Sequence, residues 1–284
     1  MKKKPDWLKL KIQGNEVNHE VSKLIDGLNL NTVCTEASCP NKMECYSHGT
    51  ATFMILGENC TRNCKFCNVT TKKPNPLDPE EPRNVAEAVK ILGLKHAVVT
   101  SVDRDDLEDE GANHFAETCR LIKEVNPEAT VELLIPDFHM RTELIDIVLA
   151  EKPDVLNHNI EVVRRLFDDI CPQSDYDTSI EVLKYAKSKG FVTKTGLMVG
   201  FGETKEDVVQ TMKDLREVGC DMITIGQYLQ PSKKHIEVTE YVHPDTFKEY
   251  GEIAKELGFK RVESSPFVRS SYRAQALTEE EINA

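Results

Sequence analysis

The amino-acid sequence predicts an α/β protein, a partial (β/α)6 TIM-like barrel with extensions at both ends. From about residue 50 onward, short apolar segments alternate with longer amphipathic ones, which is the rhythm of βα units. Each interval between the apolar segments is long enough for the helical crossover that parallel strands need. A chain of 284 residues can also bury a core of that size.

Six apolar segments are predicted to be strands, and the amphipathic segments between them are predicted to be helices. The strands cover residues 51–56, 97–101, 130–135, 154–157, 192–199 and 222–225. The helices cover residues 84–92, 111–125, 142–150, 160–167, 176–189 and 205–218. Successive right-handed crossovers curl such a sheet toward a barrel, and a doubly wound open sheet is the alternative. In both architectures ligands bind at the carboxyl ends of the strands.

The βα rhythm also divides the chain into three parts. Residues 1–50 lack it and form a predicted N-terminal extension, and residues 51–242 form the barrel core. Residues 243–284 form a C-terminal extension that begins with a predicted helix over 245–257. We expect both extensions to pack on the barrel.

The formal net charge of −12 argues against broad nucleic-acid binding and against attachment to an anionic membrane surface. The sequence has no run of about 18 apolar residues, and its start lacks the apolar stretch of a secretory signal. We therefore expect a cytoplasmic protein. In that compartment the nine cysteines are expected to be thiols or metal ligands rather than disulfides.

Six of the nine cysteines form two closely spaced triplets. The first has the pattern CxxxxCxxxxxC and the second, fourteen residues later, has CxxxCxxC; they are Cys34, Cys39 and Cys45, then Cys60, Cys64 and Cys67. Three thiolates at such spacings can converge on one soft metal centre. A structural zinc site closes with four protein ligands, whereas three cysteines suit an iron-sulfur cluster with one open iron. A zinc-binding scaffold is the alternative that these residues leave open.

The segment CTRNCKFC, at Cys60–Cys67, resembles the cluster motif of the radical S-adenosylmethionine (SAM) enzymes. Polar segments at later strand ends extend the resemblance, namely TSVDRDDL at 100–107, NHNIE at 157–161 and GLMVGFGE at 196–203. The resemblance implies a [4Fe-4S] cluster whose fourth iron is chelated by SAM. One electron from that cluster would cleave SAM to methionine and a 5′-deoxyadenosyl radical, so the cofactor carries the difficult chemistry.

The same resemblance implies that the SAM contacts come from the strand ends. The residues expected to supply them are Phe66, Thr100, Asp103, Asn157, Asn159, Glu161, Lys194, Met198, Gly200, Gln227 and Tyr228. Strand alternation puts Lys194 on one face with Gly196 and Met198, which is compatible with a barrel-facing lysine near a carboxylate or with a solvated lysine at the barrel edge. Among the histidines, His158 is the one that we expect near the cofactor.

The three remaining cysteines carry no assigned chemistry. Cys119 and Cys220 lie in periodic apolar settings and are expected to be buried thiols. Cys171, beside Pro172, is compatible with an exposed position.

The region from Thr32 to Cys67, with both triplets, resembles the signature region of the lipoyl synthase family, and the RSSY motif of that family stands at Arg269–Tyr272. The resemblance runs through nearly the whole chain. It implies that the first triplet binds an auxiliary [4Fe-4S] cluster with Ser271 as the fourth ligand. It also implies that Arg269 and Ser271 are catalytic residues. Because a hard oxygen suits this soft centre less well than a thiolate does, a serine ligand fits a cluster that gives up its sulfur.

The resemblance implies sulfur insertion at C6 and C8 of an octanoyl chain linked to a lysine. The implied protein partners are octanoylated lipoyl carrier domains, such as 2-oxoacid dehydrogenase E2 subunits and the glycine cleavage H protein. An electron donor such as flavodoxin or ferredoxin and an iron-sulfur carrier protein are implied as well. Another two-cluster radical SAM enzyme that inserts sulfur is the alternative.

Overall fold

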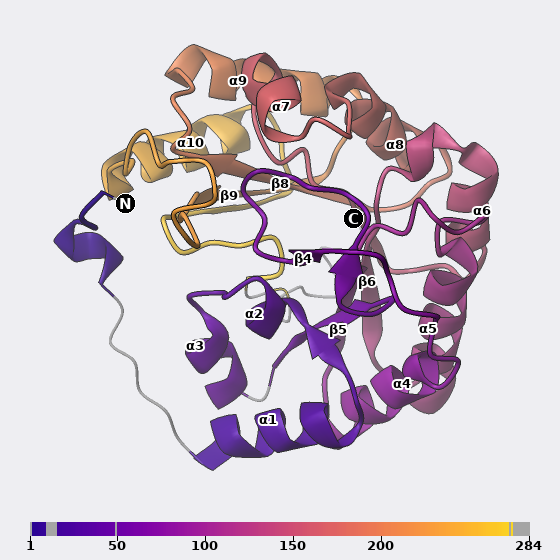
Figure 1. Cartoon of the computed structure of the whole chain (residues 1–284). Helices are drawn as coiled ribbons and strands as arrows, with labels where there is room; N and C mark the ends of the chain where they lie inside the picture. The colour runs from indigo at the N-terminus through magenta and orange to yellow at the C-terminus, as the bar shows by residue number, and fades with distance from the viewer. Residues whose placement is uncertain (1, 10–15, 49, 273, 275–284) are drawn as a thin grey trace.

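The computed structural model describes residues 2–9, 16–48, 50–272 and 274, which Figure 1 draws in colour. The last ten residues of the predicted C-terminal extension, 275–284, lie outside the described part. The strands are β1 (Asn31–Thr32), β2 (Thr52–Ile55), β3 (Asn59–Cys60), β4 (Thr70–Thr71), β5 (His96–Ser101), β6 (Thr130–Leu134), β7 (Val155–Asn157), β8 (Thr193–Val199), β9 (Met222–Gln227) and β10 (Arg261–Ser264). The α-helices are α1 (Glu16–Gly27), α2 (Val33–Glu36), α3 (Lys42–Ser47), α4 (Glu81–Leu92), α5 (Ala112–Val125), α6 (Thr142–Ala150), α7 (Arg164–Ile170), α8 (Tyr176–Ser188), α9 (Lys205–Glu217) and α10 (Pro244–Glu256), and two 3-10 turns are η1 (Asp6–Leu8) and η2 (Phe138–Met140).

Eight strands form one curved sheet in the order β1-β2-β5-β6-β7-β8-β9-β10. All neighbouring pairs are parallel except β1 with β2, which is antiparallel. Figure 1 shows helices α4 to α9 along the outside of this sheet, with α1, α2 and α3 grouped at one side. The six predicted strands are present in sequence order, so the predicted partial barrel is confirmed.

Several elements were not predicted or have other bounds than expected, among them β1, β3 and β4. Strand β10 was not predicted, because its four residues are all half-buried and lack an apolar run, yet they pair with β9. The helix expected over 160–167 begins only at Arg164 and ends at Ile170. Ile160, Val162 and Val163 are buried in an extended segment beside β8, so apolar packing rather than a helix explains their pattern.

The two faces of the sheet differ in polarity. One face packs apolar side chains such as Phe53, Val99 and Leu133 against the helices. Because successive strand residues alternate between faces, their neighbours point to the barrel interior, where Glu132 and Lys194 are buried. A polar interior provides donors and acceptors for a site inside the barrel. In the part of the chain that the structure describes, no helix is long and apolar enough to cross a membrane.

The segment after β10 lies directly on strand β9. The backbone N–H of Ser265 donates to the Ile225 carbonyl at 3.2 Å. A Cβ atom on Gly226 would lie only 2.1 Å from the Val268 carbonyl oxygen. The absence of a side chain at Gly226 therefore permits this close approach.

We expect Gly226→Ala to displace the C-terminal segment, because a backbone carbonyl cannot yield as a flexible side chain can. Overpacking of this kind should lower the free energy of unfolding by about 1–3 kcal/mol. Thermal unfolding would measure the effect. Gly27→Ala is the matched control, since a Cβ there meets nothing within 4 Å. Equal melting temperatures for the two variants would contradict the inferred contact.

Candidate active site

A cavity of about 140 Å³ opens at the carboxyl ends of strands β2, β5, β6 and β7. The predicted site residues that line it are Cys64, Phe66, Thr100, Asp103, His158, Asn159 and Glu161. These residues come from different loops and strand ends, as the barrel architecture requires. The structure thus brings the second cysteine triplet and much of the predicted SAM site together.

The loop after β2 carries the second triplet and is fixed to the loop after β5. The Cys60 sulfur accepts hydrogen bonds from the backbone N–H groups of Arg62 at 3.4 Å and Asp103 at 3.3 Å. Burial raises the pKa of the Cys60 thiol to about 12 and that of the Cys67 thiol to about 12. Thiols of this kind become thiolates when a metal displaces their protons.

The donors around the cavity fit an iron-sulfur cluster with a polar organic ligand beside it. The second triplet supplies three soft cysteine sulfurs, and nine-tenths of His158 is buried. His158 Nδ1 lies 2.9 Å from the Ile135 carbonyl, and burial lowers the pKa of the ring, so Nδ1 donates and Nε2 carries a lone pair. Nε2 is buried without a hydrogen-bond partner among the described residues. An orphaned acceptor in a cavity wall is expected to meet a donor on a bound ligand.

Arg62, for which the sequence predicted no role, anchors the loop that carries the second triplet. This loop, residues 60–67, is called the cluster loop. The Arg62 guanidinium donates two hydrogen bonds to Asp137, at 2.7 and 2.8 Å, and also binds Asp105 and Ser174. Burial disfavours the charge, but the hydrogen bonds that Arg62 donates to Asp137 and Asp105 outweigh it and raise the pKa of Arg62. A charged residue between two predicted ligand cysteines was the available signal for this role.

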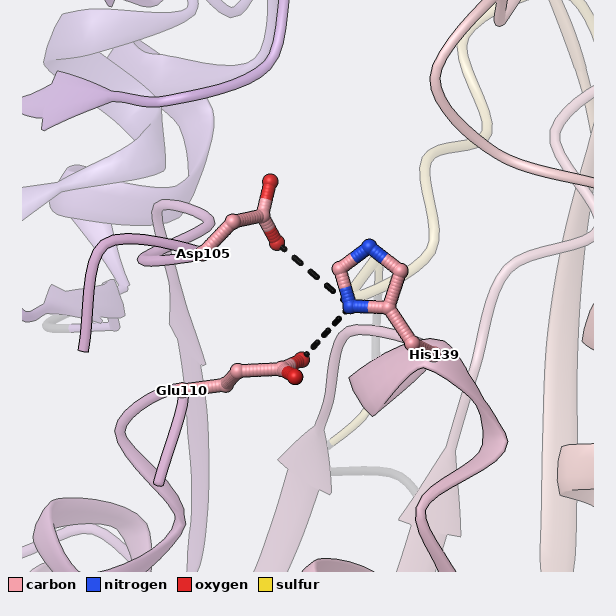
Figure 2. A group of neighbouring side chains, drawn as sticks. All are labelled: Asp105, Glu110 and His139. Atoms are coloured by element: carbon pink, nitrogen blue, oxygen red, sulfur yellow. Dashed lines mark hydrogen bonds and ion pairs between the residues drawn. The ribbon is translucent and has the colours of Figure 1, made fainter. Parts of the chain in front are cut away.

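Figure 2 shows Asp105, Glu110 and His139, with both carboxylates turned toward the imidazole ring. His139 Nδ1 lies 3.0 Å from Glu110 and 3.9 Å from Asp105. Arg62 Nη2 lies 3.3 Å from His139 Nε2, and Arg141 Nη1 lies 3.5 Å from Glu110. Because two guanidinium groups already compensate these carboxylates, we assign the group to the ion-pair network that holds the cluster loop.

Two cavity carboxyl groups have raised pKa values. Burial raises the pKa of Asp103 to about 6, although the Arg62 charge opposes that shift. Burial also raises the pKa of Glu161 to about 7. Their charged forms are therefore costly until a ligand supplies donors or a positive charge.

Glu161→Gln should stabilise the cluster-free protein at pH 8. A folded pKa of about 7, above the ordinary 4.5, contributes stability that is complete below pH 4.5 and is lost as pH rises through 7. The amide removes that loss, which we expect to amount to about 3 kcal/mol at pH 8 and nothing near pH 4.5. Thermal unfolding across this pH range would measure it. Exposed Glu128→Gln is the control, and a pH-independent difference would contradict the assignment.

The first triplet is assembled by the N-terminal segment. Cys34 lies on α2, Cys45 lies on α3, and Cys39 lies between these helices. The Cys39 N–H donates to the Cys34 carbonyl at 3.2 Å, and the charges of both thiols act on the pKa of the Cys45 thiol, so the three residues are neighbours. Burial raises the pKa of Cys34 to about 11 and that of Cys45 to about 12. The sulfur donor set again fits an iron-sulfur cluster.

The RSSY motif packs against this triplet. Thr52 forms a backbone hydrogen bond with the Cys34 thiol, and its Oγ1 donates to Ser271 Oγ at 2.7 Å. Arg269 lies within electrostatic reach of Cys39, and burial lowers the pKa of its guanidinium. The motif is thus placed beside the first triplet, although 219 residues separate Thr52 from Ser271.

Other predicted SAM contacts are occupied by bonds within the protein. Lys194 is buried and donates to both oxygens of Glu132 at 2.9 Å, so the barrel-facing alternative is confirmed over the solvated one. Asn157 also donates to Glu132, at 2.7 Å. Gln227 bonds four backbone groups, and the Tyr228 hydroxyl donates to the Ile236 carbonyl at 2.8 Å.

The remaining two predicted contacts, Met198 and Gly200, make hydrogen bonds within the protein through their backbone N–H groups. The Met198 N–H donates to the Glu161 carbonyl at 2.7 Å, and the Gly200 N–H donates to Glu203 at 2.5 Å. A role in SAM binding for these two residues and for Asn157, Lys194, Gln227 and Tyr228 stays a prediction.

The unassigned cysteines are all buried, as expected for Cys119 and Cys220. Cys171 is buried as well, so it does not take the exposed position that the sequence left open. It lines the cavity, and a hydrogen bond with Cys64 raises the pKa of its thiol. Only the folded arrangement of α7 against the loop reveals this contact.

A cysteine-lined cavity at the mouth of a partial barrel defines a radical SAM enzyme, and the Radical SAM superfamily profile matches residues 54–215. The fold is similar to the solved structure of methylornithine synthase, with a TM-score of 0.56 and 13% identity over 89% of this chain and 83% of that one. It is also similar to Streptococcus suis SuiB bound to S-adenosylmethionine, with a TM-score of 0.60 and 12% identity over 93% of this chain and 64% of that one.

Sequence comparison narrows the class. A lipoyl synthase from Caldicellulosiruptor saccharolyticus is 55% identical over 97% of this chain and 98% of its own length. Another, from Parabacteroides distasonis, is 53% identical over 96% of this chain and 97% of its own length. The chain belongs to the lipoyl synthase family.

Proposed function

We propose that this enzyme inserts two sulfur atoms, at C6 and C8, into an octanoyl chain held on a lysine of a lipoyl carrier domain. An auxiliary [4Fe-4S] cluster on Cys34, Cys39 and Cys45 is the proposed sulfur donor. The observation that carries the proposal is the position of Ser271 beside this triplet, linked through Thr52 to Cys34. Three thiols and one hydroxyl make a set of four ligands.

The second triplet has a different proposed task. Cys60, Cys64 and Cys67 hold the radical cluster, and the cavity beside them receives SAM. When bound, these groups supply a carbon radical able to remove hydrogen from unactivated C–H bonds, which acid–base side chains cannot do. The protein's own residues orient these groups. Arg62 fixes the cluster loop through Asp137, and the Asn159 and Glu161 side chains offer polar partners to SAM.

The two proposed cluster sites are joined directly. Asn68, next to Cys67, donates to the Glu36 carbonyl at 3.0 Å and to Ser38 at 3.2 Å, on the segment between Cys34 and Cys39. Reacting atoms must be held nearly in contact and away from water, so an octanoyl chain bound between the two sites fits this arrangement.

The proposed partners follow from this substrate. They are octanoylated carrier domains of 2-oxoacid dehydrogenase E2 subunits or of the glycine cleavage H protein, an electron donor of the flavodoxin or ferredoxin type, and an iron-sulfur carrier protein.

Anaerobic purification with iron and sulfide analysis tests the two-cluster assignment. We expect about eight irons per chain, and about four after replacement of the three cysteines of the first triplet by alanine. A colourless protein that contains zinc instead would support the scaffold alternative and contradict the proposal.

A further inference from the structure

We propose that Ser270, the first serine of the RSSY motif, is a positioning residue that couples the SAM cavity to the placement of Ser271. The inference rests on the proposed function, in which Ser271 completes the auxiliary site. Nothing in the motif distinguishes the roles of the two serines, but their surroundings in the folded chain differ.

The Ser270 hydroxyl is held between Asn157, the last residue of β7, and Asn159, in the loop that follows it. It donates to Asn159 Oδ1 at 2.7 Å and accepts from Asn157 Nδ2 at 3.0 Å. A serine hydroxyl can donate one hydrogen bond, and Asn159 Oδ1 accepts the one from Ser270. Ser271, one residue later, faces Thr52 on the other side. Two neighbouring residues of the motif therefore make different contacts. Ser270 contacts the carboxyl end of β7, and Ser271 contacts Thr52 beside the first triplet.

The side chain of Asn157 is held in place by the barrel interior. Its side chain is fully buried, and Nδ2 donates to Glu132 at 2.7 Å. Because the Glu132 carboxylate can only accept, this bond sets the orientation of the amide. Lys194 in turn holds Glu132 at 2.9 Å. Asn157 thus offers Ser270 a donor whose position the barrel interior determines.

Asn159 is the side that faces the ligand. It lines the cavity together with Glu161, to which its Nδ2 donates at 3.1 Å. A Cβ atom on Gly196 would lie 2.6 Å from Asn159 Oδ1, so the glycine leaves room for the side chain beside β8. A ligand that binds Asn159 or Glu161 therefore acts on the Asn159 side-chain amide, which also accepts the hydrogen bond from Ser270.

Asn159 and Ser270 thus form a short polar connection between the SAM cavity and Ser271. Occupation of the SAM cavity should restrain Asn159, which restrains Ser270 and then Ser271. Coupling between binding sites commonly amounts to 1–3 kcal/mol, or about fivefold or more in an equilibrium.

Amide hydrogen exchange of the cluster-loaded enzyme, followed by mass spectrometry without added reductant, tests the coupling. In the wild type, SAM should slow exchange of residues 267–272 by about fivefold or more. In Ser270→Ala, SAM should still slow exchange at 157–161 but leave 267–272 unchanged. Ser270→Thr, which keeps the hydroxyl, should retain the effect, whereas Ser270→Val, of the same shape, should lose it.

Ser264→Ala is the matched control, because Ser264 lies in the same C-terminal region but donates to the Phe247 carbonyl at 2.6 Å. It should respond to SAM as the wild type does. The proposal is overturned if SAM does not slow exchange at 267–272 in the wild type, or if Ser270→Ala and Ser270→Val keep the effect. The iron content of the same wild-type sample separates the two ideas: about four irons would reject the auxiliary cluster, whatever the exchange result.

Discussion

Ser271→Ala should abolish sulfur insertion while the radical cluster remains intact. The change removes the hydroxyl that Thr52 holds beside Cys34, so the auxiliary site keeps only its three thiols. Loss of residues around a metal ligand already costs 10–100-fold in affinity or activity, and loss of a ligand should reduce product by about 100-fold or more. Cys60, Cys64 and Cys67 are untouched, so cleavage of SAM in the presence of reductant should continue.

Two measurements on the same sample separate these effects, namely lipoyl product by mass spectrometry and 5′-deoxyadenosine by chromatography. The hydroxyl of Ser264 donates to the α10 backbone instead, so Ser264→Ala should still form the lipoyl product and 5′-deoxyadenosine. Normal lipoyl product from Ser271→Ala would reject the ligand assignment. Loss of 5′-deoxyadenosine as well would show that the variant damages the radical site too.

Lys194→Met should cause the largest loss of stability among the barrel substitutions. It leaves the Glu132 carboxylate, which is 0% exposed, without its cation. Removing one partner of a buried ion pair costs about 3–5 kcal/mol. Urea unfolding of the cluster-free protein at pH 7 would measure this loss. The double variant Glu132→Gln with Lys194→Met is the control, and it should recover part of the loss because no charge stays buried.

The ion pair of Glu132 and Lys194 also predicts that the free energy of unfolding depends on pH. Burial alone would raise the pKa of Glu132, but the Lys194 charge and the His96 hydrogen bond outweigh it and lower that pKa to about 2. A lowered carboxyl pKa contributes stability that is present above the ordinary value of 4.5 and is lost as pH falls through 2. The gap between wild type and Lys194→Met should therefore narrow below pH 4.5. A constant gap would contradict the ion-pair explanation.

The parts of the fold that could be predicted are those with a local pattern. Buried parallel strands such as β5 and β8 appear as short apolar runs, and the CxxxCxxC loop follows the first of the six strands directly. Strand β10 escaped prediction because its half-buried residues carry no such run. The segment before α7 was misassigned because buried residues in an extended chain can mimic a helical pattern.

The site shows the same division between local and distant information. The cysteine triplets are visible as spacings, whereas Glu132 and Lys194 are 62 residues apart and meet only across the barrel. Arg62 binds acids from two other strand ends, and Cys171 is covered by a loop that lies more than 100 residues earlier. Such contacts depend on the tertiary fold, so no short pattern in the sequence indicates them.

A single-turnover incubation tests the central claim most directly. The cluster-loaded enzyme is mixed anaerobically with an octanoyl-lysine peptide, SAM and a reductant, and the peptide is analysed by mass spectrometry. The proposed function predicts that a thiol replaces one hydrogen at C6 and one at C8 under these reducing conditions, so that the peptide gains the mass of two sulfur atoms, and that this sulfur carries the isotope label of the enzyme's own clusters. A peptide that gains no sulfur, from a protein that still cleaves SAM, would contradict the proposed function.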